Sequence, residues 1–417
     1  MIRGGMSDLL DQLKPGLSVY LPGATGESLA LRAALAADPE RAAGVRFVSC
    51  LVPGMNDFDY AALTPSTRCT TFLMPPAMRA SLEAGRVRLL PLPYSEIAEH
   101  LAARAEIDVA VFHLAPPDAD GLCSVGIAAD FAPLVWPRAR RRIVLVNRSM
   151  PVPPRSPRLP LAEADLVVEI DGPVIKAGAG GAEAAETIAM AERVAALVPD
   201  GAAIQFGIGG APAAVLARLT DRKGLTIRSG MAIDAVQALA EAGALARGGA
   251  HVAGVAFGSA GLYRFLAESD LVAFADSRVT HGAASLATVE RFVSINSALE
   301  VDLFGQANLE WRGDRVVSGV GGAPDFVRAA RRSPGGRSII ALASTAGGAR
   351  ISRIVPRLAS PTVSISRSDV DTVVTEHGAA ALADLSLDER AEALIAIAHP
   401  DHRAGLADDW ARLRARF

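Results

Sequence analysis

The regular alternation of short apolar runs with alanine-rich segments constrains the fold more than any other feature of the sequence. Runs of four to six residues, mostly Val, Ile and Leu, recur at Leu17–Leu21, Val45–Cys50, Val87–Pro91, Val109–Leu114 and Ile143–Val146. Continuous apolar runs of this length are typical of strands buried on both faces of a parallel sheet. Helical stretches such as Glu27–Ala37 and Tyr94–Ala105 lie between them. The pattern therefore predicts βαβ units and an α/β fold.

A chain of 417 residues is long for one domain and predicts two, each with its own core. The segment Asp171–Gly181 (DGPVIKAGAGG) is rich in glycine and poor in packing residues, so we interpret it as a linker between domains at 1–180 and 181–417. After it the pattern restarts with a helix over Ala184–Leu197 and a strand over Ala203–Phe206. Each half opens with a strand that runs into a glycine-containing turn, which hints at a duplicated unit.

Charge and cysteine content exclude several classes of partner. The net charge is −3, and the dense basic run Arg138 to Arg142 abuts an apolar stretch, so we interpret the run as a solvated helix end. Nucleic-acid and membrane-surface binding are therefore not expected, because they need a clustered basic excess. The three cysteines lie far apart without CxxC spacing, which predicts neither a disulfide framework nor a metal site.

The same features predict where the protein resides. Three isolated cysteines suit a reducing cytoplasm. The start MIRGGMSDLLDQL has no apolar core of a signal peptide, and no apolar run reaches the roughly 18 residues of a membrane span. We expect a soluble cytoplasmic protein.

Two glycine-rich turns are candidates for ligand contact. Gly207, Gly209 and Gly210 follow a predicted strand and precede a helix with Pro212 in its first turn. Glycine permits a tight turn and a close approach, and the amides at a helix start suit a phosphate or a developing oxyanion. A second set, Gly319, Gly321 and Gly322, follows the strand-like run Arg315 to Val317 and offers a second group of donors.

Two other interpretations of these turns remain. Both turns can be ordinary connections between strand and helix that bind nothing. A dinucleotide site is disfavoured, because the spacing at 207–212 is not GxGxxG and the next predicted strand, Leu225–Arg228, has no acidic residue at its end for a ribose.

The sequence resembles the acetyl-CoA hydrolase/transferase group, which includes 4-hydroxybutyrate and succinyl coenzyme A transferases. The resemblance is collinear over nearly the whole chain. In the second half it is carried by IQFGIGGAPAAVL, LYRFL, FVSINSALEVDLFGQAN, SGVGGAPDFVRAA, ISRIVPRL, DVDTVVTEHGAAAL and ERAEALIAIAHPDHR, and in the first half by LMPPAMRASLEAGRV, LPYSEI, DVAVFHLAPPDADGLCSVG and NRSMPVPPRSP. It implies two related open α/β domains of the CoA-transferase type, an active site in the cleft between them, and a homodimer.

The resemblance also implies a reaction and exposes a departure from it. Relatives use a glutamate that attacks an acyl-CoA and forms a glutamyl-CoA thioester, a covalent relay between two acids. That glutamate sits in a segment like I-H-S-E-M, and the matching residues here run from Ile227 to Met231, with Gly230 at the carboxylate position. A glycine has no side chain, so it cannot be the nucleophile.

Contacts with coenzyme A are expected from the same resemblance. CoA would be a substrate and not a permanently bound cofactor, and the candidate partners are an acyl-CoA or related thioester and a small carboxylic acid. The expected contacts are the two glycine turns, Ala298 and Arg350. A family segment like S-T-A-K-G-G offers a lysine to the CoA phosphates, and Gly347 stands there in this chain. Arg350 is the candidate substitute, since guanidinium binds phosphate well.

Several residues are candidates to replace the missing carboxylate. Glu376 and His377 lie in TEHG, which resembles the family's TEYG, and His281 lies in VTHGAAS. Each histidine could act as a base near neutral pH. The structural alternatives are a hydrogen-bonding role for Glu376 and merely packed or turn histidines.

Weaker candidates lie nearby. Asp234 is predicted about one turn into a helix and more often serves the helix dipole there. Ser229 with a histidine would make a nucleophile and base pair. Glu300 and Asp302 are expected to anchor a turn or pair with arginine.

Three hypotheses follow from a preserved scaffold without its nucleophile. The leading one is hydrolysis or related acyl chemistry on a CoA thioester, with the glycine amides as oxyanion donors and His281, Glu376 or His377 as base. The second is a CoA transferase that uses a carboxylate from elsewhere in the cleft. The third is a non-catalytic relative that binds a CoA ester or a partner subunit.

Overall fold

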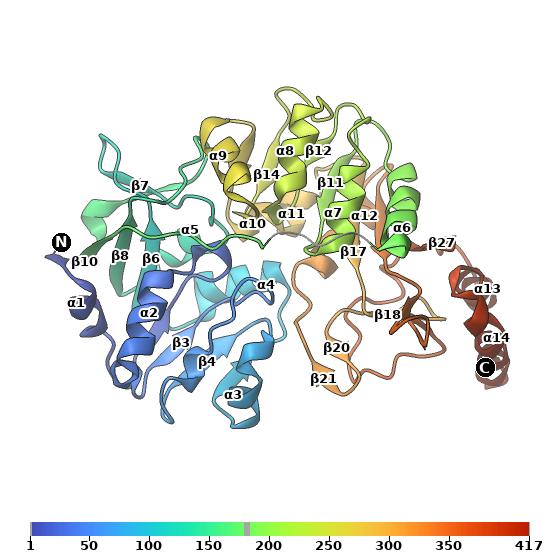
Figure 1. The fold of residues 1–417 in the computed structure, drawn as a ribbon, viewed down its shortest axis with the longest axis horizontal. Helices are drawn as coiled ribbons and strands as arrows, with labels where there is room; N and C mark the ends of the chain where they lie inside the picture. Colours follow the sequence, from blue (N-terminus) through green and yellow to red (C-terminus); the bar gives the residue numbers. More distant parts are fainter. Residues whose placement is uncertain (1, 179–183, 417) are drawn as a thin grey trace.

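The structure, a computed structural model, describes residues 2–178 and 184–416, and Figure 1 shows two large sheets with helices packed around them. The first sheet has eight strands in the order β1-β10-β8-β6-β2-β3-β4-β5, and every neighbouring pair is parallel. Its strands are β1 (Ile2–Gly4), β2 (Ser18–Tyr20), β3 (Arg46–Val48), β4 (Arg68–Thr71), β5 (Val87–Leu89), β6 (Val109–Leu114), β8 (Arg141–Asn147) and β10 (Leu166–Ile170).

The second sheet has six strands in the order β12-β11-β17-β22-β26-β27, parallel except for the hairpin between β26 and β27. Its strands are β11 (Ala203–Phe206), β12 (Thr226–Ile227), β17 (Phe292–Ser297), β22 (Arg337–Ala341), β26 (Thr372–Thr375) and β27 (Gly378–Ala381). Residues before 171 and residues after 202 therefore build separate sheets. The predicted boundary at 180/181 lies outside the described residues.

Helices pack around the two large sheets (Figure 1). The remaining short strands form small separate sheets. The helices are α1 (Met6–Leu10), α2 (Leu29–Ala37), α3 (Arg79–Glu83), α4 (Tyr94–Glu99), α5 (Ala132–Val135), α6 (Ala185–Ala196), α7 (Gly210–Ala217), α8 (Asp234–Glu241), α9 (Ala260–Glu268), α10 (Ser277–Thr280), α11 (Ala283–Leu286), α12 (Ala323–Arg332), α13 (Leu387–Ile397) and α14 (Pro400–Arg414). The short strands are β7 (Leu122–Ser124), β9 (Arg158–Pro160), β13 (Met231–Ala232), β14 (His251–Ala253), β15 (Val255–Ala256), β16 (Val272–Phe274), β18 (Glu300–Asp302), β19 (Ala307–Asn308), β20 (Trp311–Arg312), β21 (Arg315–Val316), β23 (Thr345–Ala346), β24 (Ile351–Ser352) and β25 (Ile354–Val355).

The predicted apolar runs of the first half are confirmed as strands β2, β3, β5, β6 and β8. All six residues of β6 are buried, as expected of a central parallel strand with both faces covered. The strand-like run Arg315–Val317 is confirmed as strand β21, which pairs with β20 in a small antiparallel hairpin.

Several of the backbone hydrogen bonds that join the two halves involve one loop, residues 125–131. Ala129 N–H donates to Gly254 O at 2.8 Å, Ala256 N–H donates to Ile127 O at 2.8 Å, and Ser277 N–H donates to Asp130 O at 2.8 Å. A loop of the first half is thereby held on short strands of the second. One continuous core of buried side chains also includes residues from both halves.

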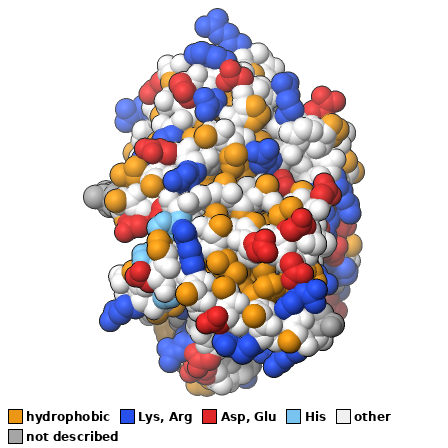
Figure 2. Space-filling view, turned by 90° about the vertical axis from the view of Figure 1, so that its right-hand side faces the viewer, with side chains coloured by type: hydrophobic (Ala, Val, Ile, Leu, Met, Phe, Trp, Pro, Cys, Tyr) orange, Lys and Arg blue, Asp and Glu red, His pale blue; other side chains and the backbone are white. Residues whose placement is uncertain are grey.

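The surface agrees with the expected charge balance. Figure 2 shows acidic and basic side chains interspersed with apolar ones over the end of the molecule that faces the viewer. In the part of the chain that the structure describes, no helix combines the length and apolarity needed to traverse a bilayer.

Candidate active site

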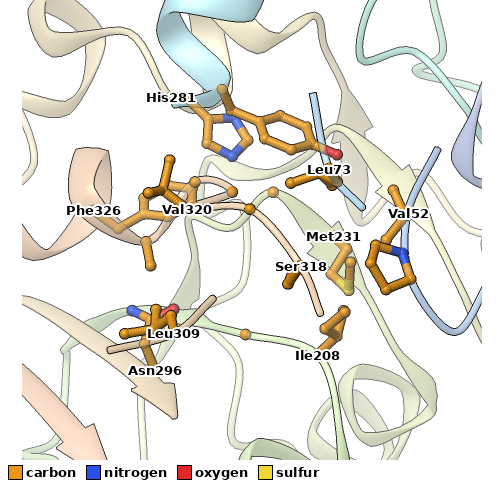
Figure 3. A pocket seen from close by; sticks show the side chains of 18 of the residues that line it. Val52, Leu73, Ile208, Met231, His281, Asn296, Leu309, Ser318, Val320 and Phe326 are labelled. Carbon is orange, nitrogen blue, oxygen red and sulfur yellow. The ribbon is translucent and has the colours of Figure 1, made fainter. Parts of the chain in front are cut away.

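A pocket of about 220 Å³ lies where the two halves meet. Figure 3 shows His281 on one wall, with Val52 and Leu73 from the first half on one side and Phe326 and Val320 from the second on the other. The lining drawn from the first half includes Ala24, Val52, Met55, Leu73, Tyr94 and Asp130, and that from the second includes Gly207, Ile208, Gly230, Met231, Val255, His281, Asn296, Leu309, Gly321, Gly322 and Phe326.

The first glycine turn connects β11 to α7 but places its residues differently from the prediction. Gly207 and Ile208 line the pocket, whereas Gly209 and Gly210 are exposed and are not among its lining residues. Gly209 has φ of 108°, a conformation that favours glycine. The Gly207 N–H already donates to Ile295 O at 3.0 Å. The expected oxyanion role of Gly209 and Gly210 is therefore not supported by their position.

The second glycine turn reaches the pocket as predicted. Gly321 and Gly322 line it just before helix α12, and the Gly321 carbonyl accepts a hydrogen bond from Tyr94 N–H at 3.2 Å across the two halves. A β-carbon on Gly322 would stand 2.4 Å from Nε2 of His281. No side chain fits at that position while the imidazole keeps its place.

Gly230, the position of the absent glutamate, lines the same pocket. Its carbonyl accepts hydrogen bonds from Gly254 N–H at 3.0 Å and Val255 N–H at 3.1 Å, which fixes the backbone. A β-carbon here would lie 3.0 Å from both Cε1 and Nε2 of His281. The backbone of Gly230 is not in the left-handed region, so the imidazole, and not the local conformation, makes glycine fit.

His281 is held rigidly beside that vacancy. It follows helix α10, is 4% exposed, and lies between Tyr94 (ring centroids 4.7 Å apart) and Phe326 (4.5 Å). Burial lowers the pKa of its imidazole to about 3, because a low-polarity site disfavours the charged form. The side chain is neutral at physiological pH.

The hydrogen bonds of Thr280 assign the tautomer of His281. Thr280 Oγ1 lies 2.8 Å from His281 Nδ1 and 3.3 Å from Asp276 O. We infer the arrangement in which the single hydroxyl proton lies toward Asp276 O and Thr280 accepts from Nδ1–H. The lone pair is then on Nε2, which lies 3.0 Å and 2.4 Å from the places where β-carbons on Gly230 and Gly322 would stand. This arrangement is that of a general base.

Asp130 is a pocket residue that sequence reasoning missed. It is 8% exposed, and Phe131 N–H donates to its Oδ1 at 3.0 Å. Within residues 2–178 and 184–416 no ion pair joins it to Lys or Arg. Burial raises its carboxyl pKa to about 7. The available signal was one acid inside the otherwise apolar segment Ile127–Pro133.

The predicted base candidates Glu376 and His377 lie elsewhere. The Glu376 carboxylate accepts hydrogen bonds from Ser344 N–H at 2.9 Å and from Ser344 Oγ at 2.6 Å. His377 lies beside it and packs against His399, with ring centroids 5.3 Å apart. Neither lines the pocket. Their geometry favours the structural alternative, and a catalytic role for either residue stays a prediction.

The remaining predicted contacts are also outside the pocket lining. Arg350 is exposed, and its Nε donates to Gly347 O at 2.7 Å beside the β23–β24 hairpin. Ala298 is 6% exposed and packs in the core of the second half. The structure therefore does not bring these two residues to His281.

The weaker candidates have structural partners. Asp234 is the first residue of α8, not one turn into it, and accepts from Ser259 N–H at 3.0 Å. Ser229 Oγ donates to Phe206 O at 3.3 Å and is not paired with a histidine. Asp302 accepts from the Phe304 and Gln306 amides and anchors the turn after β18, as expected. No group of three metal-ligating side chains occurs in the described chain.

Two α/β lobes around an apolar pocket with a glycine turn on its wall define a protein of the CoA-transferase fold class. Residues 5–173 match the acetyl-CoA hydrolase/transferase N-terminal domain, and residues 258–410 match the C-terminal domain. The chain belongs to the acetyl-CoA hydrolase/transferase family.

Three relatives illustrate the similarity. The 4-hydroxybutyrate coenzyme A transferase of Clostridium kluyveri is 33% identical over 94% of this chain and 93% of its own length. The butyryl-CoA:acetate CoA-transferase of Anaerostipes caccae is 34% identical over 76% of this chain and 75% of its own. The crystal structure of RipA from Yersinia pestis is 29% identical, with a TM-score of 0.91 over 99% of this chain and 98% of its own.

Proposed function

We propose that this protein hydrolyses a coenzyme A thioester directly, without a covalent acyl-enzyme or enzyme-CoA intermediate. Supporting observations are the family membership, the absence of a side chain at Gly230, and the neutral imidazole of His281 whose Nε2 points at that vacancy. The last of these carries the proposal. A water molecule hydrogen-bonded to Nε2 in the pocket would supply the nucleophile that relatives of the family supply as a carboxylate.

The reaction uses groups already in the pocket. His281 Nε2 takes a proton from water as the water oxygen bonds to the thioester carbonyl carbon. The carbonyl oxygen, now negative, is stabilised by backbone amides at the start of the ten-residue helix α12, where Gly322 and Ala323 line the pocket. The carbon–sulfur bond then breaks, and the thiolate takes up the proton from His281. The products are a carboxylic acid and CoA with a free thiol.

Release of free thiol from a panel of acyl-CoAs tests the proposal. The wild-type protein should release CoA, and His281→Asn should lose about 10²- to 10⁴-fold in kcat, the usual contribution of a general base. His377→Asn is the matched control, because that histidine lies outside the pocket. Absence of turnover with every acyl-CoA, together with absence of CoA binding by calorimetry, would reject the proposal.

A second candidate is supported by Asp130. A carboxyl group that lines the same pocket as Gly230 could form the covalent intermediate of a CoA transferase. Its carboxylate would attack the thioester and displace the CoA thiolate, which would then attack the aspartyl carbonyl of the resulting anhydride, form an aspartyl-CoA thioester and release the first acid. An acceptor carboxylate would displace the thiolate from that thioester, and the thiolate would attack the acceptor's acyl carbon to give the new acyl-CoA and the free Asp130 carboxylate. Borohydride or hydroxylamine trapping followed by mass spectrometry decides between the candidates. An adduct on the peptide that contains Asp130 supports transfer, and an unmodified peptide during turnover supports direct hydrolysis.

A further inference from the structure

The walls of the pocket carry few charged side chains. Among the described residues that line it, none is Lys or Arg, and Asp130 carries the lone carboxyl group. Apolar side chains from both halves form much of the remaining wall, including Val52, Met55, Leu73 and Val255. The one imidazole, His281, is neutral. A negative group in this pocket would therefore find no opposite charge on the walls.

This charge pattern restricts the acyl group of a thioester whose carbonyl carbon reacts beside His281. A second carboxylate on a short acyl chain lies only two or three methylene groups from that carbon, so it would be held inside the pocket. Gln205, Asn296 and Ser297 line the pocket and can offer neutral hydrogen bonds, but burying a carboxylate without a cationic partner is unfavourable. The carboxyl of Asp130 adds repulsion once it is ionised, because like charges at short range interact strongly where water is scarce.

Asp130 is in a fixed position to exert this effect. Its carbonyl is bonded to Ser277 N–H, and its neighbour Ala129 donates to Gly254 O, so its backbone is attached to the second half of the molecule. Gly254 in turn donates to the Gly230 carbonyl at 3.0 Å. The β-carbon of Asp130 lies 3.7 Å from the place where a β-carbon on Gly254 would stand. The carboxyl group is therefore close to the vacancy at Gly230.

The size of the pocket favours a bulky apolar group. Its volume of about 220 Å³ exceeds the roughly 150 Å³ of an apolar protein cavity that accepts benzene. A branched, alicyclic or aromatic acyl group of about five to eight carbons would exclude water from these walls more completely than an acetyl group would.

We propose that the pocket selects an uncharged apolar acyl group, and that Asp130 is the specificity residue that excludes acyl groups bearing a second carboxylate. This selectivity rests on the proposed action on CoA thioesters. Measured as turnover it assumes direct hydrolysis, because Asp130→Asn would abolish activity if Asp130 were the nucleophile. Measured as ligand binding it applies to either reaction.

A comparison of valeryl-CoA with glutaryl-CoA tests the selectivity, because both acyl chains have five carbons and only the second carries a carboxylate. At pH 8.5 the kcat/KM of the wild-type protein should favour valeryl-CoA by about 100-fold or more. Asp130→Asn should narrow that ratio by about tenfold. Met55→Lys, which places a cation on the pocket wall, should narrow it further.

The control is Asp325→Asn. Asp325 is another buried acid, bonded to Ser95 and outside this pocket, so its replacement should leave the ratio unchanged. Equal rates for the two substrates in the wild-type protein, or an unchanged ratio in both Asp130→Asn and Met55→Lys, would overturn the proposal.

Calorimetric binding separates a failure of this inference from a failure of the proposed reaction. The non-hydrolysable thioethers S-pentyl-CoA and S-(4-carboxybutyl)-CoA need no turnover. Preferential binding of the pentyl compound in a protein without hydrolase activity would support the selectivity while rejecting the reaction. Equal binding of the two thioethers would reject the selectivity even in an active enzyme.

Discussion

The imidazole of His281 occupies the space into which a side chain at position 230 would project. A β-carbon on Gly230 would lie 3.0 Å from two atoms of that ring, closer than ordinary van der Waals contact. The ring itself is confined by Tyr94 and Phe326. A side chain at position 230 would therefore require the imidazole to shift by a few tenths of an ångström, so the absence of the family's glutamate and the position of His281 are structurally linked.

This relationship predicts that Gly230 and His281 are energetically coupled. Gly230→Ala should lower the free energy of unfolding by about 1–3 kcal/mol, the usual cost of overpacking a core. In a His281→Ala background the same change should cost little, giving a coupling of about 1 kcal/mol or more in a double-mutant cycle measured by urea denaturation.

The control for this cycle is Gly405→Ala. Gly405 lies inside helix α14 with open space around its Cα, so alanine there should be neutral or slightly stabilising. Strictly additive effects of Gly230→Ala and His281→Ala would show that the ring does not restrict position 230.

The pH dependence of activity separates the two candidate reactions. Burial holds the pKa of His281 at about 3, so the imidazole stays unprotonated and competent as a base from pH 8 to pH 5. Direct hydrolysis should therefore show no loss of kcat/KM in that range from this group. An aspartyl nucleophile must instead be ionised, and the pKa of Asp130 is raised to about 7.

Measurement of kcat/KM between pH 5 and 8.5 distinguishes these cases. A flat profile is the expected result for the His281 mechanism. A fall in kcat/KM of about tenfold for each pH unit below 7 would favour the transferase mechanism instead. That mechanism also requires Asp130→Asn to be inactive.

Much of the architecture was predictable from local sequence. Buried parallel strands such as β6 are mostly apolar along their length, because both faces of the sheet are covered. The run Val109–Leu114 could therefore be recognised as a strand from the sequence. The sequence also showed that Gly230 stands at the position of the family's nucleophile, because the matching segment can be compared residue by residue. The sequence could not show that His281 lies against Gly230, because His281 comes from another segment of the chain.

The missed and misplaced site residues share one physical cause. Asp130 becomes a pocket residue only because the loop around it is held on the second half by bonds from Ala129 and Ser277, a contact that no local pattern encodes. Gly209 and Gly210 were expected to face the cleft, but which side of a turn faces a cavity is set by the docking of the halves. Glu376 was indistinguishable from a catalytic acid until its bonds to Ser344 were known.

Asp130 should make stability fall as pH rises. Its pKa is about 7 in the folded protein and near 3.8 when exposed, so between these values the native state holds more protons than the unfolded state. Stability must then decrease with rising pH across this window, by an amount on the order of a few kcal/mol. The loss is complete above about pH 7.

Asp130→Asn should remove this dependence, because the amide does not titrate. Urea denaturation of both proteins at pH 5 and pH 8 should show the variant gaining stability relative to wild type at pH 8. Asp325, whose pKa is raised to about 6 by burial, is present in both proteins and cancels in the comparison. A stability difference that is the same at both pH values would contradict the burial of an unpaired carboxyl.

Glu376 should prove to be a structural residue. Its carboxylate accepts two hydrogen bonds from Ser344, one from the backbone N–H and one from the hydroxyl, and it lies outside the pocket lining. Glu376→Ala leaves both donors without their acceptor and should lower the free energy of unfolding by about 1–3 kcal/mol. Glu376→Gln keeps one acceptor oxygen and should lose less stability.

Both variants should retain kcat for thioester hydrolysis within about threefold at a temperature where they are folded. If a Glu376 variant with an unchanged unfolding curve lost as much kcat as His281→Asn, the residue would have a catalytic role and the prediction would be wrong.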